Sequence, residues 1–207
     1  DNGPARASRS TALELMHDTA TGAGYGIGAA RGITAGRKGY KSALFEGGIG
    51  VPFIARWPGT IDAGKVDKTS MISAVDLLPT FCEIAGVTLP ESYKPDGVSQ
   101  IATLTGKATV GRTKPLFWKM NSAWPIQKSR PHHWVSYAIV DQQWKLVSNK
   151  DASYVELYDL GKDPYEKHDL KETHAVIVDR LLEKLEQWKA SLPAKPTGDV
   201  FSAERSE

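Results

Sequence analysis

The sequence predicts an α/β fold at its start, followed by a small α+β unit that combines an antiparallel sheet with one helix. Three observations lead to this prediction. A nearly continuous apolar run, VPFIARW at residues 51–57, follows a pair of glycines. Several short segments rich in Trp, Tyr and Val lie between residues 115 and 159. An apolar stripe with helical spacing then runs through residues 174–190.

The apolar run at residues 51–57 predicts a buried strand, which Pro58 and Gly59 end. Pro52 lacks a backbone donor, so it should lie at the start of this strand or on a sheet edge. The preceding Glu46-Gly47-Gly48 predicts a break between two structured pieces, because paired glycines adopt backbone angles that other residues avoid.

Residues 73–86 are expected to carry a helix, with Ser73 or Asp76 as its N-cap. Only the first few N–H groups of a helix lack partners within it, so Pro79 must lie in the first turn. Asp76 is then the N-cap and Gly86 the residue that ends the helix. The expected apolar face consists of Leu77, Leu78, Phe81 and Ile84. A metal-ligand role for Asp76 is the weaker alternative.

The sequence changes near residues 110–114 from an irregular, polar stretch to short segments rich in Trp, Tyr and Val. We predict a boundary there between units spanning 1–112 and 113–207. The second unit should contain strands at 115–120, 133–140, 143–148 and 154–159, with a hairpin turn at Asp141-Gln142. The closing helix shows one apolar stripe and ends before Pro193. The stripe consists of Val178, Leu181, Leu182, Leu185 and Trp188.

The composition is that of an ordinary globular protein, with 207 residues, 41% hydrophobic and 24% charged. A net charge of +2 argues neither for nor against nucleic acid, and we predict no such partner. No apolar run approaches the roughly 20 residues of a membrane span, so we predict no membrane partner. The one cysteine, Cys82, excludes an internal disulfide and is expected to be a small buried residue.

Two places in the chain carry candidate chemistry. Asp1 and Asn2 offer a carboxylate and an amide carbonyl side by side, as hard cations such as Ca²⁺ require, although Ca²⁺ takes about 6–8 oxygen ligands. The alternative is an Asn-Gly turn at a frayed end. Lys41 places a compact positive charge ahead of Glu46-Gly47-Gly48, or is an ordinary solvated lysine. Arg37 and Lys38 could line a pocket for an anion or form a solvated surface.

These residues carry a family resemblance. Residues 41–52, KSALFEGGIGVP, resemble the K-G-x-x-x-E-G-G-x-R-V-P segment of type I sulfatases, in the alkaline phosphatase superfamily. Asp1-Asn2-Gly3 resembles the D-N-G that precedes it. Ser42 and Gly50 depart from the pattern, which has Gly and Arg there. Further matches follow in family order: Trp57-Pro58-Gly59, Val75-Asp76-Leu77-Leu78-Pro79-Thr80, Ala85-Gly86-Val87, Asp96-Gly97-Val98-Ser99, Trp144-Lys145-Leu146, and Glu156-Leu157-Tyr158-Asp159-Leu160 with Asp163-Pro164.

The resemblance implies a role for each candidate. Asp1 and Asn2 would be the last two ligands of a Ca²⁺ site, and Lys41 would contact the sulfate group. The strand at 51–57 would belong to an alkaline-phosphatase-like, mostly parallel sheet. The substrate would be a sulfate ester of a carbohydrate or of an aryl alcohol, and the location periplasmic or secreted.

The sulfatase nucleophile is not found in this sequence. The family converts a Cys or Ser in C/S-x-P-x-R into formylglycine; Cys82 does not fit the motif, and Ser191-Leu192-Pro193-Ala194-Lys195 follows the last helix. We therefore expect the C-terminal portion of a sulfatase, inactive without the missing N-terminal portion. The alternatives are an inert scaffold or substrate-binding segment, and a phosphodiesterase or phosphonate hydrolase of the same superfamily.

Overall fold

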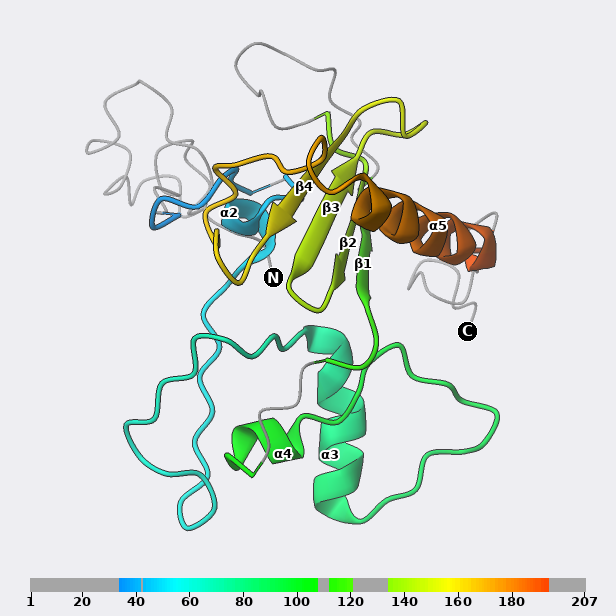
Figure 1. The fold of residues 1–207 in the computed structure, drawn as a ribbon. Helices are drawn as coiled ribbons and strands as arrows, with labels where there is room; N and C mark the ends of the chain where they lie inside the picture. Colours follow the sequence, from blue (N-terminus) through cyan, green and yellow to red (C-terminus); the bar gives the residue numbers. More distant parts are fainter. Residues whose placement is uncertain (1–33, 42, 108–111, 121–133, 194–207) are drawn as a thin grey trace, which may run out of the picture.

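A computed structural model describes residues 34–41, 43–107, 112–120 and 134–193 (Figure 1). Asp1 and Asn2 therefore lie outside the described residues. The described elements, in chain order, are α2 (Glu46–Ile49), the 3₁₀ helix η1 (Ala74–Asp76), α3 (Leu77–Ala85), α4 (Ile101–Leu104), β1 (Leu116–Lys119), β2 (Tyr137–Asp141), β3 (Trp144–Ser148), β4 (Val155–Asp159) and α5 (Ala175–Ser191).

The four strands form one antiparallel sheet in the order β1-β2-β3-β4, as the sequence predicted. The β2–β3 pair is a tight hairpin that turns through Gln142 and Gln143. Gln142 has a φ of 55°, so the turn lies one residue later than the predicted Asp141-Gln142. The sheet registers Ile139 opposite Leu146, and Leu146 opposite Leu157.

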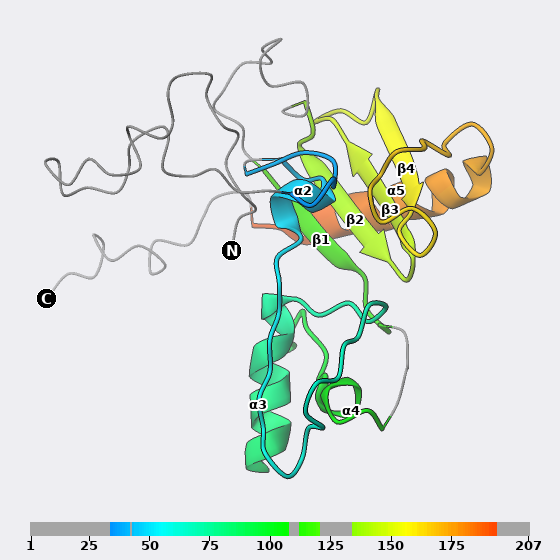
Figure 2. The same cartoon turned by 90° about the vertical axis from the view of Figure 1, so that its left-hand side faces the viewer.

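The two faces of the sheet pack on different partners, with α5 along one face and α2 on the other (Figure 2). On one face, the row of Ile139, Leu146 and Leu157 packs against α5, which confirms the predicted backing helix. The other face carries Ala138, Val147 and Tyr158 and packs against residues 43–45 just before α2. Both faces are covered, so the side chains of β2 and β3 are largely buried.

The structure does not show the predicted strand at residues 51–57. The segment is extended but carries no ladder pairing, and Ile54 is 90% exposed. A strand needs a neighbour for its N–H and C=O groups, and no described strand lies beside it. The described sheet is entirely antiparallel. Just before this segment, Glu46-Gly47-Gly48 forms the one-turn helix α2 instead of a break.

Helix α3 begins and ends where the sequence predicted. Asp76 is its N-cap, Pro79 is its third residue, and Gly86 ends it with a φ of 67°. The predicted apolar face is present but points outward, because Leu78, Phe81 and Ile84 are all exposed. The buried side of α3 is polar, with Thr80 facing the segment that leads to α4.

Helices α3 and α4 lie beside the sheet unit, connected to it by extended segments (Figure 1). Within the described residues, no helix combines the length and apolar character that crossing a membrane requires.

Candidate functional site: the Lys41 turn and its support

Lys41 lies in an exposed turn, and the residues that follow this turn are buried in the core. The turn closes through a hydrogen bond from the Ala43 N–H to the Tyr40 carbonyl, at 3.0 Å. Lys41 itself is exposed, whereas Ala43, Leu44 and Phe45 are at most 4% exposed. The ammonium group is therefore available to a ligand while the backbone next to it is fixed by the core.

The two glycines of α2 allow the Lys41 turn to lie directly on the helix. A Cβ atom on Gly47 would come within 2.3 Å of the Gly39 carbonyl oxygen. One on Gly48 would lie 2.1 Å from the Ala43 carbonyl oxygen. Real Cβ atoms do not approach backbone this closely, so the paired glycines are required by packing at this point.

Glu46 connects this turn to the sheet through a buried charge network. Lys145, on β3, donates to Glu46 Oε1 at 2.8 Å and lies 2.8 Å from Glu166 Oε1. Glu166 Oε2 accepts a hydrogen bond from the backbone N–H of Glu46 at 2.7 Å. The side chains of Lys145 and Glu166 are completely buried. Two carboxylates and one ammonium therefore hold the start of α2 against the sheet.

Burial raises the pKa of the Glu166 carboxyl, against the opposing effect of the Lys145 ammonium. Glu166 also has a φ of 55°, in the left-handed region that residues with a Cβ rarely adopt. The backbone at Glu166 is thus held in an unfavourable conformation while its side chain enters the network. Such strain persists only where surrounding contacts determine it.

Lys38 is a second anchor for the turn. Its ammonium donates to Glu156 and to the Tyr158 hydroxyl, at 2.7 Å each, and lies 4.4 Å from the centre of the Phe45 ring. The Tyr158 hydroxyl also donates to Glu156. Burial and the neighbouring Glu156 raise the pKa of Tyr158, which keeps it a donor. The Lys38 ammonium is thus engaged by Glu156, Tyr158 and Phe45 and does not line an anion pocket.

Arg37 lies beside Gly50, at which position the sulfatase pattern has Arg. A Cβ atom on Gly50 would lie 2.5 Å from Arg37 Nη1, the end of a flexible side chain, and 2.7 Å from the Glu46 carbonyl oxygen. The same nitrogen is 3.8 Å from Glu46 Oε2. A positive charge therefore still lies beside Glu46, supplied from another point in the sequence.

Of the predicted site residues, only Lys41 falls in the described part of the chain. Asp1 and Asn2 do not, so their Ca²⁺ role stays a prediction; among described residues, no group of three or more His, Cys, Asp or Glu is arranged to hold a metal. Asp76 is structural: its carboxylate accepts from the N–H groups of Ser73 and Val98 and pairs with Arg112.

Lys145 and Glu166, which support the site, were not among the residues predicted from the sequence. A signal for Lys145 was present, because residues two apart on a strand share a face and Val147 belongs to the buried face. A lysine in that row is buried and needs a carboxylate partner. Glu166 had no such signal, since it lies in a loop outside any regular pattern.

Comparison with known families gives one match over most of the chain. Residues 37–191 match the family described as N-sulphoglucosamine sulphohydrolase, C-terminal. The matched range begins at the Lys41 turn and ends with α5, so it includes every contact described above.

Relatives and solved structures agree with this match. An N-acetylgalactosamine-6-O-sulfatase of Bacteroides thetaiotaomicron is 29% identical over 73% of this chain and 30% of its own length. An ulvan-active sulfatase of Formosa agariphila is 29% identical over 78% of this chain and 36% of its own. The crystal structure of Ps i-CgsB in complex with k-i-k-neocarrahexaose is similar with a TM-score of 0.62 and 25% identity, over 83% of this chain and 36% of that one. The chain thus spans about a third of the length of these proteins.

Proposed function

The chain belongs to the N-sulphoglucosamine sulphohydrolase C-terminal family, and from this premise we propose that it is the C-terminal portion of a sulfatase, a sulfuric ester hydrolase. The observation that carries the proposal is the arrangement at Lys41. An exposed ammonium is held on a turn that two buried charge clusters fasten to the sheet. Fixed positive charge is what a reaction that develops negative charge requires.

We assign Lys41 to the sulfate group. A sulfate ester carries negative charge on its non-bridging oxygens, and more develops on the leaving oxygen as the S–O bond breaks. An ammonium that is already in place stabilises both without reorganising during the reaction. Lys38 and Lys145 are excluded from this role because carboxylates within 2.8 Å engage them. Arg37 is half-exposed beside Glu46 and shapes the positive surroundings of the turn.

The proposed substrate is a sulfated carbohydrate. The support comes from relatives whose names specify N-acetylgalactosamine-6-O-sulfate and ulvan, and from the similar structure with a bound neocarrahexaose. An aryl sulfate is the alternative ester and serves as a convenient assay substrate. We also propose a periplasmic or secreted location, which rests on the resemblance to type I sulfatases.

We propose that the rest of the sulfatase covers the exposed apolar surface of residues 51–57 and α3. Soluble proteins rarely expose large contiguous apolar patches. Residues 51–57 would become a strand of a mostly parallel sheet only with strands supplied from outside the described chain. The exposed residues are Val51, Phe53, Ile54, Trp57, Leu78, Phe81 and Ile84.

Calcium at Asp1 and Asn2 remains part of the proposal, carried by the sequence resemblance. A bound Ca²⁺ would supply positive charge beside the sulfate, and most of its oxygen ligands would come from the missing portion. Tight Ca²⁺ binding by the 207-residue chain alone, measured by calorimetry, would contradict this division of the ligands.

The test is steady-state hydrolysis of an aryl sulfate by the complete protein. Lys41→Ala is expected to lower kcat by about 10²–10³, because the ammonium acts mainly in the transition state. Lys41→Arg should recover little, since a guanidinium differs in shape and hydration. Lys68→Ala is the matched control, as Lys68 is also an exposed lysine. Wild-type turnover in Lys41→Ala would overturn the assignment.

The alternative activities are separated by the choice of substrate and of chain. An aryl phosphonate ester assayed beside the aryl sulfate distinguishes a phosphonate hydrolase from a sulfatase. The 207-residue chain alone should hydrolyse neither ester, because its own residues include no formylglycine motif.

A further inference from the structure

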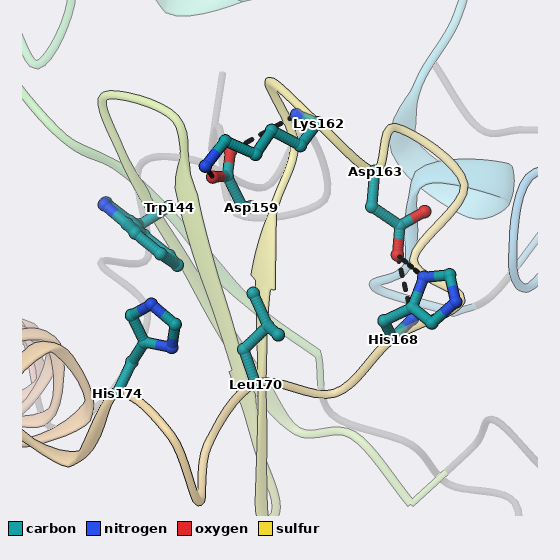
Figure 3. A pocket seen from close by; sticks show the side chains of 7 residues that line it. All are labelled: Trp144, Asp159, Lys162, Asp163, His168, Leu170 and His174. Carbon is teal, nitrogen blue, oxygen red and sulfur yellow. Dashed lines mark hydrogen bonds and ion pairs between the residues drawn. The ribbon is translucent and has the colours of Figure 1, made fainter.

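A pocket of about 330 Å³ opens where the loop after β4 meets the start of α5 (Figure 3). Trp144, at the start of β3, and His174, the N-cap of α5, form one side of it. Asp163 and His168 lie on the opposite side, with Leu170 between the two sides (Figure 3). The pocket thus combines an aromatic wall with a polar one.

The polar wall is fixed by backbone hydrogen bonds. Asp163 Oδ2 accepts from the N–H groups of Lys167 and His168, at 2.7 and 2.8 Å. Burial opposes ionisation of Asp163, but these hydrogen bonds prevail and lower its pKa. Its other oxygen, Oδ1, receives no hydrogen bond from the residues that the structure describes. The Asp163 carboxylate is therefore held rigidly in this wall.

The upper end of the pocket carries a carboxylate and a movable ammonium. Asp159 Oδ1 accepts from the N–H groups of Gly161 and Lys162, at 3.1 and 3.3 Å. The Lys162 ammonium is 3.8 Å from Asp159 Oδ2, too far for a hydrogen bond, and its side chain is 88% exposed. Lys162 can therefore turn toward a bound molecule without breaking a buried contact.

The aromatic wall offers a flat apolar surface with a polar edge. The rings of Trp144 and His174 lie 5.1 Å apart between centroids and are tilted by 46°. The His174 Nδ1 atom lies 2.9 Å from the Thr173 hydroxyl, which orients the imidazole. Leu170 adds aliphatic surface to the pocket. Aromatic side chains of this kind bind ligands that have one apolar face and polar edges.

The pocket presents charged groups of both signs. Two carboxylates, one ammonium and two imidazoles supply both hydrogen-bond acceptors and donors. Hydroxyl groups match such a mixture, because each donates and accepts. The volume lies near the lower end of small-molecule sites, about 300–1,000 Å³, which suits one ring.

We propose that this pocket is a subsite for one unsulfated sugar ring of a glycan chain. The choice of a sugar over other polyhydroxyl rings rests on the proposed function. The pocket shares its loop with Glu166, whose carboxylate holds the start of α2 beneath the Lys41 turn. One loop thus supports both the proposed sulfate site and a site for another part of the same substrate.

The experiment measures binding directly in the complete protein. Methyl β-galactoside, N-acetylgalactosamine and inorganic sulfate are titrated separately into protein labelled with ¹⁵N-tryptophan. The Trp144 indole signal is assigned with Trp144→Phe. A saturable shift with a sugar is expected, at a Kd of about 1 mM, as suits a single ring. Inorganic sulfate should leave this signal unmoved.

Two variants and a matched control locate the binding. Lys162→Ala and His174→Ala should each weaken sugar binding at least several-fold, whereas Lys184→Ala, on α5 but outside the pocket lining, should not. The proposal is overturned if no sugar gives a saturable shift, if sulfate alone does, or if both pocket variants bind like wild type. Hydrolysis of an aryl sulfate by the unaltered protein is measured separately. Failure of that assay rejects the proposed function, while the binding result still decides the pocket.

Discussion

The sheet unit and the α3 segment bury opposite kinds of side chain. In the sheet unit, Ile139, Leu146 and Leu181 are fully buried, and charges enter the interior only as ion pairs. On α3 the apolar side chains face outward, with Phe81 60% exposed, whereas Asp76 is completely buried. The two regions therefore depend on different interactions.

The difference shows which part of the chain contains its own core. Each apolar row of the sheet has a partner in this sequence, either α5 or residues 43–45. The α3 segment has polar partners instead: Asp76 pairs with Arg112, and the Thr80 hydroxyl accepts the Gln100 N–H at 2.9 Å. Its apolar side is exposed among the residues that the structure describes. The sheet unit should thus be the more stable of the two in the isolated chain.

The largest expected effect is on the charge network of the sheet unit. Lys145→Met leaves two buried carboxylates without their ammonium and should lower the free energy of unfolding by about 3–5 kcal/mol. Lys184→Met is the matched control, because its ion pair with Asp141 is partly exposed and should cost at most about 1 kcal/mol. Urea unfolding measures both. Equal small losses would show that the network contributes little.

The same variant has a predicted pH dependence. Because burial raises the pKa of Glu166 above 4.5, the folded chain holds this proton more tightly than the unfolded chain. Its contribution to stability is therefore most favourable below the unfolded pKa and falls as pH rises toward the folded pKa. Lys145→Met removes an ammonium that lowers this pKa, so its penalty should be smaller at about pH 5 than at about pH 8. The opposite order would contradict the sign.

Removing an apolar side chain should distinguish the two regions directly. Leu181→Ala leaves a cavity between α5 and the sheet and should cost about 2–5 kcal/mol. Phe81→Ala in the isolated chain should change stability by no more than about 0.5 kcal/mol, since the ring is exposed. In the complete protein Phe81→Ala should instead be costly. A small effect in both proteins would show that this face stays uncovered.

Weakening Asp76 should affect only the α3 segment. Asp76→Asn removes the charge that pairs with the buried Arg112 and should cost about 1–3 kcal/mol. Hydrogen exchange should quicken in α3 and in α4, while amides of β2 and β3 keep their protection. Uniform loss of protection would mean that the two regions unfold together.

The smallest effect is expected at the end of α3. Gly86 has a φ of 67° and open space around its Cα, so Gly86→Ala meets no steric contact and costs only backbone strain. That cost should be about 1 kcal/mol, measured by thermal unfolding. Glu83→Ala, at an exposed position of the same helix, should be close to neutral.

Local patterns by themselves determined the secondary structure of the sheet unit and the limits of α3. The short segments rich in Trp, Tyr and Val, the stripe of α5, and the Pro79 and Gly86 signals depend on nearby residues alone. Such features are readable because backbone angles and short-range periodicity produce them. Lys41 was singled out in another way, by the resemblance of residues 41–52 to the sulfatase segment.

Only the tertiary structure decided which distant residues contact one another. Residues 51–57 have the apolar composition of a strand, yet composition shows that a segment can be buried and not what will cover it. Glu46 meets Lys145 across 99 residues and Glu166 across 120. Arg37 lies beside Gly50 only because the turn folds back on α2. A contact between distant residues depends on the whole path of the chain, and no local pattern encodes that path.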